Sequence, residues 1–256
     1  MKVALLARVA RPLWMAGPAG LALPARAAAK RVPAAVRRLD RAGPGGGSHG
    51  NARDIADLPT ALRRFLAHPR PPVLLAAVAS VVATRAARGR WRRADAVVAL
   101  GALVAQPFVE WAIHREILHA RPDSRFGEIF WAAAGFGHAQ HHADPASLDT
   151  MFLRPQEIVP LGAVAVGVAL AAPRSVATGA VCVGLGVLAY DWTHFLIHTA
   201  YQPRTALYRR TWRNHRLHHY RNERYWLGVT SPVADVLLGT EPARDTVPLS
   251  RAAPAR

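Results

Sequence analysis

Four apolar stretches, each bordered by arginines, constrain the fold of this chain more than any other feature. They cover residues 73–84, 96–109, 158–172 and 176–189 and contain no charged side chain. Each is shorter than the roughly 20 residues of a membrane span, and the first is the shortest. Taken singly, each is compatible with a buried helix of a soluble protein. Arginines at the borders are typical of membrane proteins, so we predict an all-α integral membrane protein with about four transmembrane helices in two hairpins.

The composition narrows the class of protein further. The chain has 256 residues, 51% of them hydrophobic, and a formal net charge of +17. Strong basicity first suggests nucleic-acid binding, but here the arginines flank apolar runs and form no single stripe, so we expect no nucleic-acid partner. The single cysteine, Cys182, excludes a disulfide framework, a CxxC zinc site and a protein-bound iron–sulfur cluster.

Three parts follow from the pattern along the chain. Residues 1–56 are predicted to be a disordered basic tail that ends in a glycine-rich linker, because prolines and glycines interrupt the only signal-peptide-like run. Residues 57–241 form the expected domain, and residues 242–256 a C-terminal tail. Within 57–68 the apolar residues fall at helical spacing around Arg63 and Arg64. This pattern indicates a short amphipathic helix, lying on a membrane surface or packed as an ordinary surface helix.

Ten of the twelve histidines lie in two polar segments, and each segment follows one predicted hairpin. They form four boxes, HX4H, HX2HH, HX3H and HX2HH, which comprise His114 and His119; His138, His141 and His142; His194 and His198; and His215, His218 and His219.

The spacing within the boxes has a geometric meaning. An α-helix turns about 100° per residue, so residues at i, i+3 and i+4 share one face. The three histidines of the second box are therefore expected to point at one centre, and so are the three of the fourth box. His114 and His119 are five residues apart, about 140° around an ideal helix. They converge only at a helix end or at a distortion of the helix.

A metal centre explains the ten histidines together better than ten independent roles do. Packed imidazoles cannot all be protonated, and neutral imidazole is a common ligand for iron, zinc, copper and nickel. Ten nitrogens exceed the needs of one ion, so we predict two ions a few ångström apart with about five ligands each. His49 and His68 are expected to be ordinary side chains.

Three carboxylates near the boxes are candidates for orienting the imidazole rings. Glu110 lies one turn before His114, Asp191 lies three residues before His194, and Asp144 follows the second box. Each is alternatively a plain interface charge. A carboxylate-bridged di-iron scheme needs repeated Glu-x-x-His motifs, and only Glu116–His119 fits that pattern, so we set this scheme aside.

The four boxes in this order resemble the membrane fatty acid hydroxylase/sterol desaturase superfamily, and most of all its fatty acid 2-hydroxylase branch. The resemblance covers about residues 61–241. It is carried by EWAIH at 110–114 with His119, HAQHH at 138–142, YDWTH at 190–194 with His198, HRLHH at 215–219, GVTSP at 228–232 and DVLLGT at 235–240.

The resemblance implies a membrane anchor, a histidine-rich helical cytosolic cap, and an oxidoreductase with a dimetal centre that uses O2 to hydroxylate a lipid chain. Zinc has no redox change, so two iron ions are expected, with zinc as a substitute. Several eukaryotic members carry a fused haem domain. This sequence shows no such segment, which implies a separate reductase or electron-carrier protein.

The expected substrate is the acyl chain of a fatty acid or lipid, oxidised near its carboxyl end. The alternatives are a sterol or carotenoid oxidase or desaturase of the same superfamily, and a non-redox membrane metal-binding protein. We expect a multi-pass protein of the cell membrane. If residues 73–84 cross the bilayer, 27 of the 33 basic residues share the side of the boxes. The positive-inside bias then places the boxes in the cytoplasm.

Overall fold

The structure, a computed structural model, describes residues 49–250, and the predicted disordered tail lies almost wholly outside them. The described part is helical and contains no β-strand, only an isolated bridge between Asn51 and Ser147. Its helices are α3 (Leu58–Ala67), α4 (Arg70–Ala87), α5 (Arg93–Ala112), α6 (Arg125–Phe130), α7 (Phe136–Ala143), α8 (Leu148–Met151), α9 (Pro155–Ala171), α10 (Arg174–His198), α11 (Ala206–Tyr220) and α12 (Val233–Leu238). Two π-helices, Ile113–Leu118 and Trp131–Gly135, and two short 3-10 helices, Ala52–Asp54 and Arg244–Thr246, complete it.

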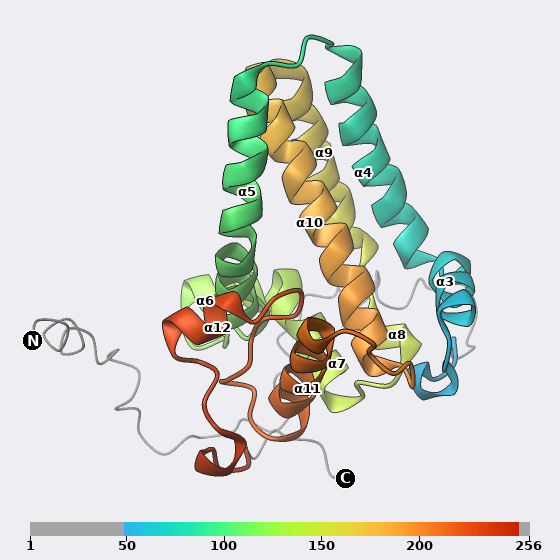
Figure 1. The fold of residues 1–256 in the computed structure, drawn as a ribbon, viewed down its shortest axis with the longest axis vertical. Coiled ribbons are helices and arrows are strands. Elements are labelled where there is room, and N and C mark those ends of the chain that lie inside the picture. The colour runs from blue at the N-terminus through green and yellow to red at the C-terminus, as the bar shows by residue number, and fades with distance from the viewer. Residues whose placement is uncertain (1–48, 251–256) are drawn as a thin grey trace, which may run out of the picture. The chain divides into compact units, whose positions relative to one another are not determined.

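The four apolar stretches form the four long helices of a bundle. Helices α4 and α5 run antiparallel, as do α9 and α10, and both connecting turns lie at the same end of the bundle, which we call the tip (Figure 1). At the other end, α6, α7, α8, α11 and α12 with their connecting segments form a layer that we call the cap (Figure 1). The chain thus builds two helical hairpins. The first leads into the cap segment that carries the first two boxes, whereas the third box lies at the end of α10 itself and the fourth on α11 in the cap.

Three segments are long and apolar enough to cross a membrane, namely Arg93–Leu118, Leu148–Ala171 and Arg174–His198. Helix α4 meets the same criteria only together with α3, to which it is joined at an 83° bend. This agrees with the expectation that the first stretch is the shortest. Residues 49–250 are therefore all-helical with three candidate spans, or four if the bent pair counts as one.

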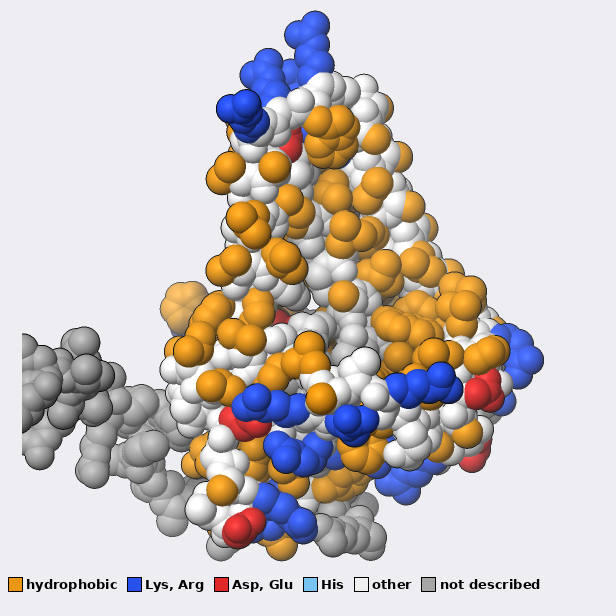
Figure 2. Space-filling view, in the orientation of Figure 1, with side chains coloured by type: hydrophobic (Ala, Val, Ile, Leu, Met, Phe, Trp, Pro, Cys, Tyr) orange, Lys and Arg blue, Asp and Glu red, His pale blue; other side chains and the backbone are white. Residues whose placement is uncertain are grey.

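The bundle turns its large apolar side chains outward. Leu103 and Leu161 are about 70% exposed, and hydrophobic side chains cover the visible face of the long helices (Figure 2). A soluble bundle would bury these leucines, whereas lipid tails are as apolar as leucine and impose no such need. Inside the bundle small residues allow close approach, and a Cβ on Gly186 would collide with the side chain of Gln106.

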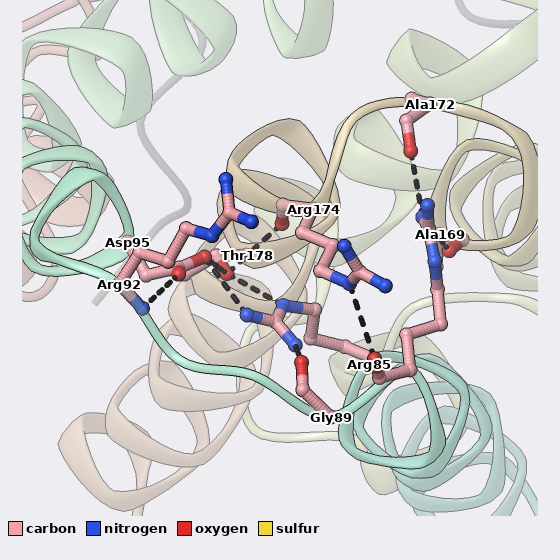
Figure 3. Close-up of polar contacts among 9 residues, drawn as sticks. Arg85, Gly89, Arg92, Asp95, Ala169, Ala172, Arg174 and Thr178 are labelled. Carbon is pink, nitrogen blue, oxygen red and sulfur yellow. Dashed lines mark hydrogen bonds and ion pairs between the residues drawn. The ribbon is translucent and has the colours of Figure 1, made fainter.

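A buried polar cluster ties three helices together at the tip (Figure 3). The guanidinium of Arg85 donates to Asp95 Oδ1 at 2.9 Å and to Thr178 Oγ1 at 2.8 Å, and the Thr178 hydroxyl donates to the same carboxylate oxygen at 2.6 Å. Nearby, Arg88 donates to the carbonyls of Ala169 and Ala172 at the turn between α9 and α10. Arg85 and Arg88 therefore hold the two hairpins together at the tip.

Helix α3 has two apolar faces. Asp57 caps its first turn by accepting from the Thr60 amide at 2.8 Å. Phe65 is buried against the body, while Leu62 and Leu66 are about half exposed on the other side. The buried face fits the packed-helix interpretation of 57–68, and the exposed apolar face is the one that a membrane surface would contact.

Residues outside the predicted 57–241 domain also pack on its body. Ala52 and Ile55 are fully buried and belong to the core that contains Phe65 and Phe195. At the other end Val247 is buried, and the Ser250 amide donates to the Arg221 carbonyl at 2.7 Å.

We predict that Asp95→Ala lowers the midpoint of thermal unfolding in detergent, because it leaves the Arg85 guanidinium buried without its counter-charge. The matched control is Glu241→Ala, which removes the carboxylate partner of Arg210 in a partly exposed pair on the cap. Melting curves of both variants check this. An equal or larger effect of the Glu241 variant would contradict the structural role of the tip cluster.

Candidate metal centre

The first histidine box lies on a distorted helix end. The chain leaves α5 as a π-helix over Ile113–Leu118, and the His119 amide donates to the His114 carbonyl at 3.2 Å in an i→i+5 bond. The wider turn brings residues five apart onto one side, so the two rings stack with centroids 5.1 Å apart. The distortion that the five-residue spacing requires is therefore present.

The ten box histidines converge into two adjacent groups of five. In each group, one ligand atom per residue lies within 4.8 Å of all the others. Group one contains His114, His119, His138, His142 and His218, and group two contains His141, His194, His198, His215 and His219. The groups adjoin, since the rings of His142 and His219 stack at 4.0 Å.

The expectation that each HX2HH box points at one centre is wrong. In the second box His138 and His142 join group one while His141 joins group two, and in the fourth box His218 separates from His215 and His219. The physical reason is the helical angle. Residues at i and i+4 share a stripe, whereas the histidine between them is displaced along the helix and around its axis. Each of these two boxes therefore serves both groups.

The distances between nitrogens match a metal's coordination shell. In group one the Nε2 atoms of His138 and His119, and of His142 and His138, are 3.1 Å apart. In group two the Nε2 atoms of His219 and His215 are 3.0 Å apart. Metal–imidazole bonds of about 2.0–2.1 Å at right-angled to tetrahedral geometry separate neighbouring nitrogens by about 2.9–3.4 Å. The residues therefore fit a metal ion in each group.

The hydrogen bonds of the outer ring nitrogens make the inner ones available to a metal. His114 Nδ1 donates to the Leu227 carbonyl at 2.5 Å, and His218 Nδ1 donates to the Tyr225 carbonyl at 2.9 Å. His194 is similarly bonded to the Met151 backbone. A ring that donates from Nδ1 presents the lone pair of Nε2. In His194 this Nε2 is buried and has no hydrogen-bond partner.

Burial keeps these imidazoles neutral. It lowers the pKa of His138, His141, His215 and His219 well below the usual value, and the neighbouring histidines lower the pKa further. The physical cause is that a charged imidazolium loses its hydration in the interior and is repelled by other imidazolium rings. The neutral ring is the form that binds a metal, so the site is ready for ligation at neutral pH.

Glu110 supports group one through the loop that follows the fourth box. Its carboxylate accepts from the amides of Val229 and Thr230 at 2.5 and 2.9 Å and from the Thr230 hydroxyl at 2.5 Å. These bonds hold the segment whose Leu227 carbonyl accepts the hydrogen bond from His114 Nδ1. Glu110 therefore orients a ring through the backbone and touches no imidazole directly.

Asp235 holds the same loop from the other side, and sequence reasoning missed it. Its carboxylate accepts from the amides of Leu227 and Gly228 and from the Thr240 hydroxyl. A Cβ on Gly228 would lie 2.2 Å from the Ser231 carbonyl oxygen and 2.9 Å from the Asp235 carboxylate, so only glycine fits here. The signal was present in the segments 228–232 and 235–240, which the family resemblance singled out without giving them a role.

The other two carboxylates lie differently. Asp191 is buried and accepts from the Leu153 amide at 3.3 Å, while its second oxygen has no hydrogen-bond partner. Asp144 is exposed at the C-cap of α7. The hydrogen bonds within the described residues connect neither of them to a box histidine.

Comparison with known proteins agrees with the geometry. The fatty acid hydroxylase family matches residues 99–240, the part of the chain that contains all four boxes. The chain is 28% identical over 141 residues to the dihydroceramide fatty acyl 2-hydroxylase FAH1 of Arabidopsis thaliana, a match that covers 53% of this chain and 56% of FAH1. It is 27% identical over 179 residues to FAH2 of the same organism, covering 67% of this chain and 72% of FAH2.

Among solved structures, the hydroxylase domain of full-length Scs7p is similar in fold, with a TM-score of 0.51 and 24% identity over 75% of this chain and 69% of that one. The chain belongs to the fatty acid hydroxylase family. Within that family its curated relatives are 2-hydroxylases, and the resemblance noted in the sequence is confirmed.

We predict that protein purified in detergent and washed with a weak chelator retains two metal ions per chain. His141→Ala and His218→Ala each remove a ligand from one group and should lower the metal content, whereas His49→Ala, outside both groups, should keep both ions. Elemental analysis of the purified variants measures this. A content near zero or one ion in folded wild-type protein would contradict a two-metal centre.

We also predict that Glu110→Ala weakens metal binding by about 10-fold, the lower end of the cost of removing an outer partner of a ligand. Glu110→Gln is the matched control, because its amide oxygen can still accept the two backbone N–H groups. Competition with a chromophoric chelator gives both affinities. Equal affinities of the alanine variant and the wild type would show that the 227–230 loop does not hold His114.

Proposed function

We propose that this protein is an O2-dependent membrane hydroxylase that holds two iron ions and acts on the acyl chain of a fatty acid or lipid near its carboxyl end. The observation that carries the proposal is the pair of five-histidine groups where the cap meets the apolar helical bundle. Membership of the fatty acid hydroxylase family supports the reaction class.

The ten histidines would hold the metals, five to each ion. Iron bound there supplies the redox chemistry that lets O2 and two electrons oxidise a C–H bond, which zinc cannot do. The protein's own contribution is to bury the rings, to keep them neutral and to fix the Nδ1 protons of His114 and His218 on backbone carbonyls. No side chain is needed as a nucleophile or as a general acid.

The position of the cap supports a substrate whose polar end is at the membrane surface. The cap helices α6 and α12 carry exposed apolar residues, including Phe126, Ile129 and Leu237. Together with the exposed apolar face of α3, they would contact the membrane surface and hold the cap against the bilayer. Drawing a mid-chain carbon up to the metals would expose apolar surface at roughly 0.8 kcal/mol per CH₂, so a carbon near the carboxyl end is favoured.

The names of the two curated relatives support the same position. Both are described as dihydroceramide fatty acyl 2-hydroxylases, and the match to FAH1 spans little more than half of that protein. We therefore propose carbon 2 of an acyl chain as the site of oxidation. We propose as well that electrons reach the metals from a separate reductase or electron-carrier protein.

We predict that expression under oxygen in a host without hydroxylated lipids produces 2-hydroxy fatty acids, provided that a reductase is supplied. Fragmentation mass spectrometry of the released fatty acids locates the hydroxyl group. The His141→Ala variant should yield none, while Ser80→Ala, an exposed position on α4, should match the wild type.

Other products would identify other functions. A new double bond, or oxygen on a ring lipid only, would indicate a desaturase or a sterol or carotenoid oxidase. The absence of any oxygen-dependent lipid change with every reductase and lipid class tested would favour a non-redox metal-binding protein.

We propose that four helices cross the cell membrane as two hairpins with the cap in the cytoplasm, and the positive-inside bias predicts this orientation. A reporter fused after Thr240 should therefore report a cytoplasmic location, and one inserted at Gly89, in the turn between α4 and α5, the opposite side. Two reporters on the same side would contradict three spans between them, α5, α9 and α10. An external location after Thr240 would reverse the orientation.

A further inference from the structure

A third cluster of metal-ligating side chains lies outside the ten-histidine centre. It consists of His49, His68 and Asp149, each of which offers one ligand atom within 4.8 Å of the other two. His68 contacts Phe152 at 4.6 Å between ring centroids, and Phe152 contacts Phe195 of α10 at 5.2 Å. No ring contact joins this cluster to the box histidines within the described residues, so it is a separate site.

Backbone pairing brings the cluster together from distant parts of the chain. The Leu148 amide donates to the Gly50 carbonyl at 3.1 Å and the Ala52 amide donates to the Ala146 carbonyl at 2.8 Å, which fixes the segment after His49 beside the start of α8. In that register both the backbone N–H and the ring Nδ1 of His49 bond to Asp149 Oδ1.

His68 completes the cluster from the bend between α3 and α4. It is the C-cap of α3, where its amide donates to the Arg64 carbonyl at 3.1 Å, and its ring packs on Phe152. The ring centroid lies 4.5 Å from that of His49.

One ring nitrogen of His68 lacks a partner. The residue is only 4% exposed, and its Nε2 is buried without a hydrogen bond. Leaving a polar atom in this state costs about 1–3 kcal/mol. The other nitrogen, Nδ1, accepts from the Arg70 amide at 3.3 Å, which is longer than a usual hydrogen bond. Coordination through Nε2 would move the ring proton to Nδ1 and give up this long contact for a bond to a metal.

We propose that His49, His68 and Asp149 form a third metal site, which binds a divalent ion of the zinc type. Two imidazoles and one carboxylate are the donor set that Zn²⁺ takes with three protein ligands, and water fills the fourth position. Neutral rings with one carboxylate leave the loaded site with a single positive charge.

The consequence of binding would be structural. The ion would join the segment before α3, the bend after α3 and the start of α8, three parts of the chain that are otherwise linked by backbone bonds and packing. Helix α8 also carries Met151, whose backbone bonds to His194 of group two. A bound ion therefore steadies both ends of α3 and the support of one box histidine.

The test is a zinc titration of detergent-purified protein whose two-metal centre is already filled, read with a competing chromophoric chelator and by elemental analysis. Wild-type protein should bind one further zinc ion per chain. His49→Gln and Asp149→Asn should each weaken this binding by at least the factor of about 10–100 that loss of an outer partner costs. Both should keep the two ions of the centre, which shows that they are folded.

Two further measurements separate this site from the proposed function. His141→Ala, which lacks a ligand of group two, should still bind the further zinc ion. Zinc should also raise the melting temperature of the wild type and slow proteolysis before α3, and it should do neither in Asp149→Asn. Failure of the wild type to take up a further ion at a tenfold excess of zinc, or unchanged uptake by both variants, would overturn the proposal.

Discussion

The structure depends on the burial of ten neutral imidazoles with their nitrogens facing one another. Nε2 atoms 3.0–3.2 Å apart bring lone pairs together. The rings of His114 and His218, whose Nδ1–H groups are bonded to carbonyls, have no proton to place between them. Such an arrangement is unfavourable without a cation and strongly favourable with one. The distortion of the first box, the sharing of two boxes between the groups and the loop over His114 all serve this convergence.

Backbone carbonyls hold the rings of His114 and His218, and carboxylates act one step further out. Glu110 and Asp235 clamp the 227–230 loop from two helices, and the loop presents a carbonyl to His114. A carboxylate bonded directly to a ring would draw the proton of the imidazole more strongly than a neutral carbonyl does. Because a carbonyl partner is neutral, it adds no charge, and the net charge of the centre is set by the metals and by their other ligands.

The two ends of the bundle meet different physical demands. At the tip, Arg85 and Asp95 form a buried pair that holds helices together where the chain turns. At the cap end, buried histidines form the centre, an ion pair of low exposure joins Arg154 and Glu157 at the start of α9, and arginines of α11 such as Arg209 and Arg213 remain on the outside. Between the ends the surface is apolar (Figure 2). This division is the one expected of a chain whose middle faces lipid and whose ends face water.

The sequence by itself determined the four long helices, the ten histidines and their division over two segments, because hydrophobic runs and helical spacing are local properties. It also required a distortion at His114 and His119, since five residues do not fit one face of an α-helix. Only the tertiary structure decided which ring joins which group. Residues such as His141 and His142 are neighbours in the chain, and their partners come from other helices.

Tertiary structure also decided the roles of Asp235, Glu110 and the cluster of His49, His68 and Asp149. Asp235 and Glu110 meet one loop although they are more than a hundred residues apart in the sequence. His49 and Asp149 are likewise a hundred residues apart, and His68 seemed an ordinary side chain before a proline. No local pattern encodes such pairings, because they depend on how backbone segments are paired and packed after the helices have formed.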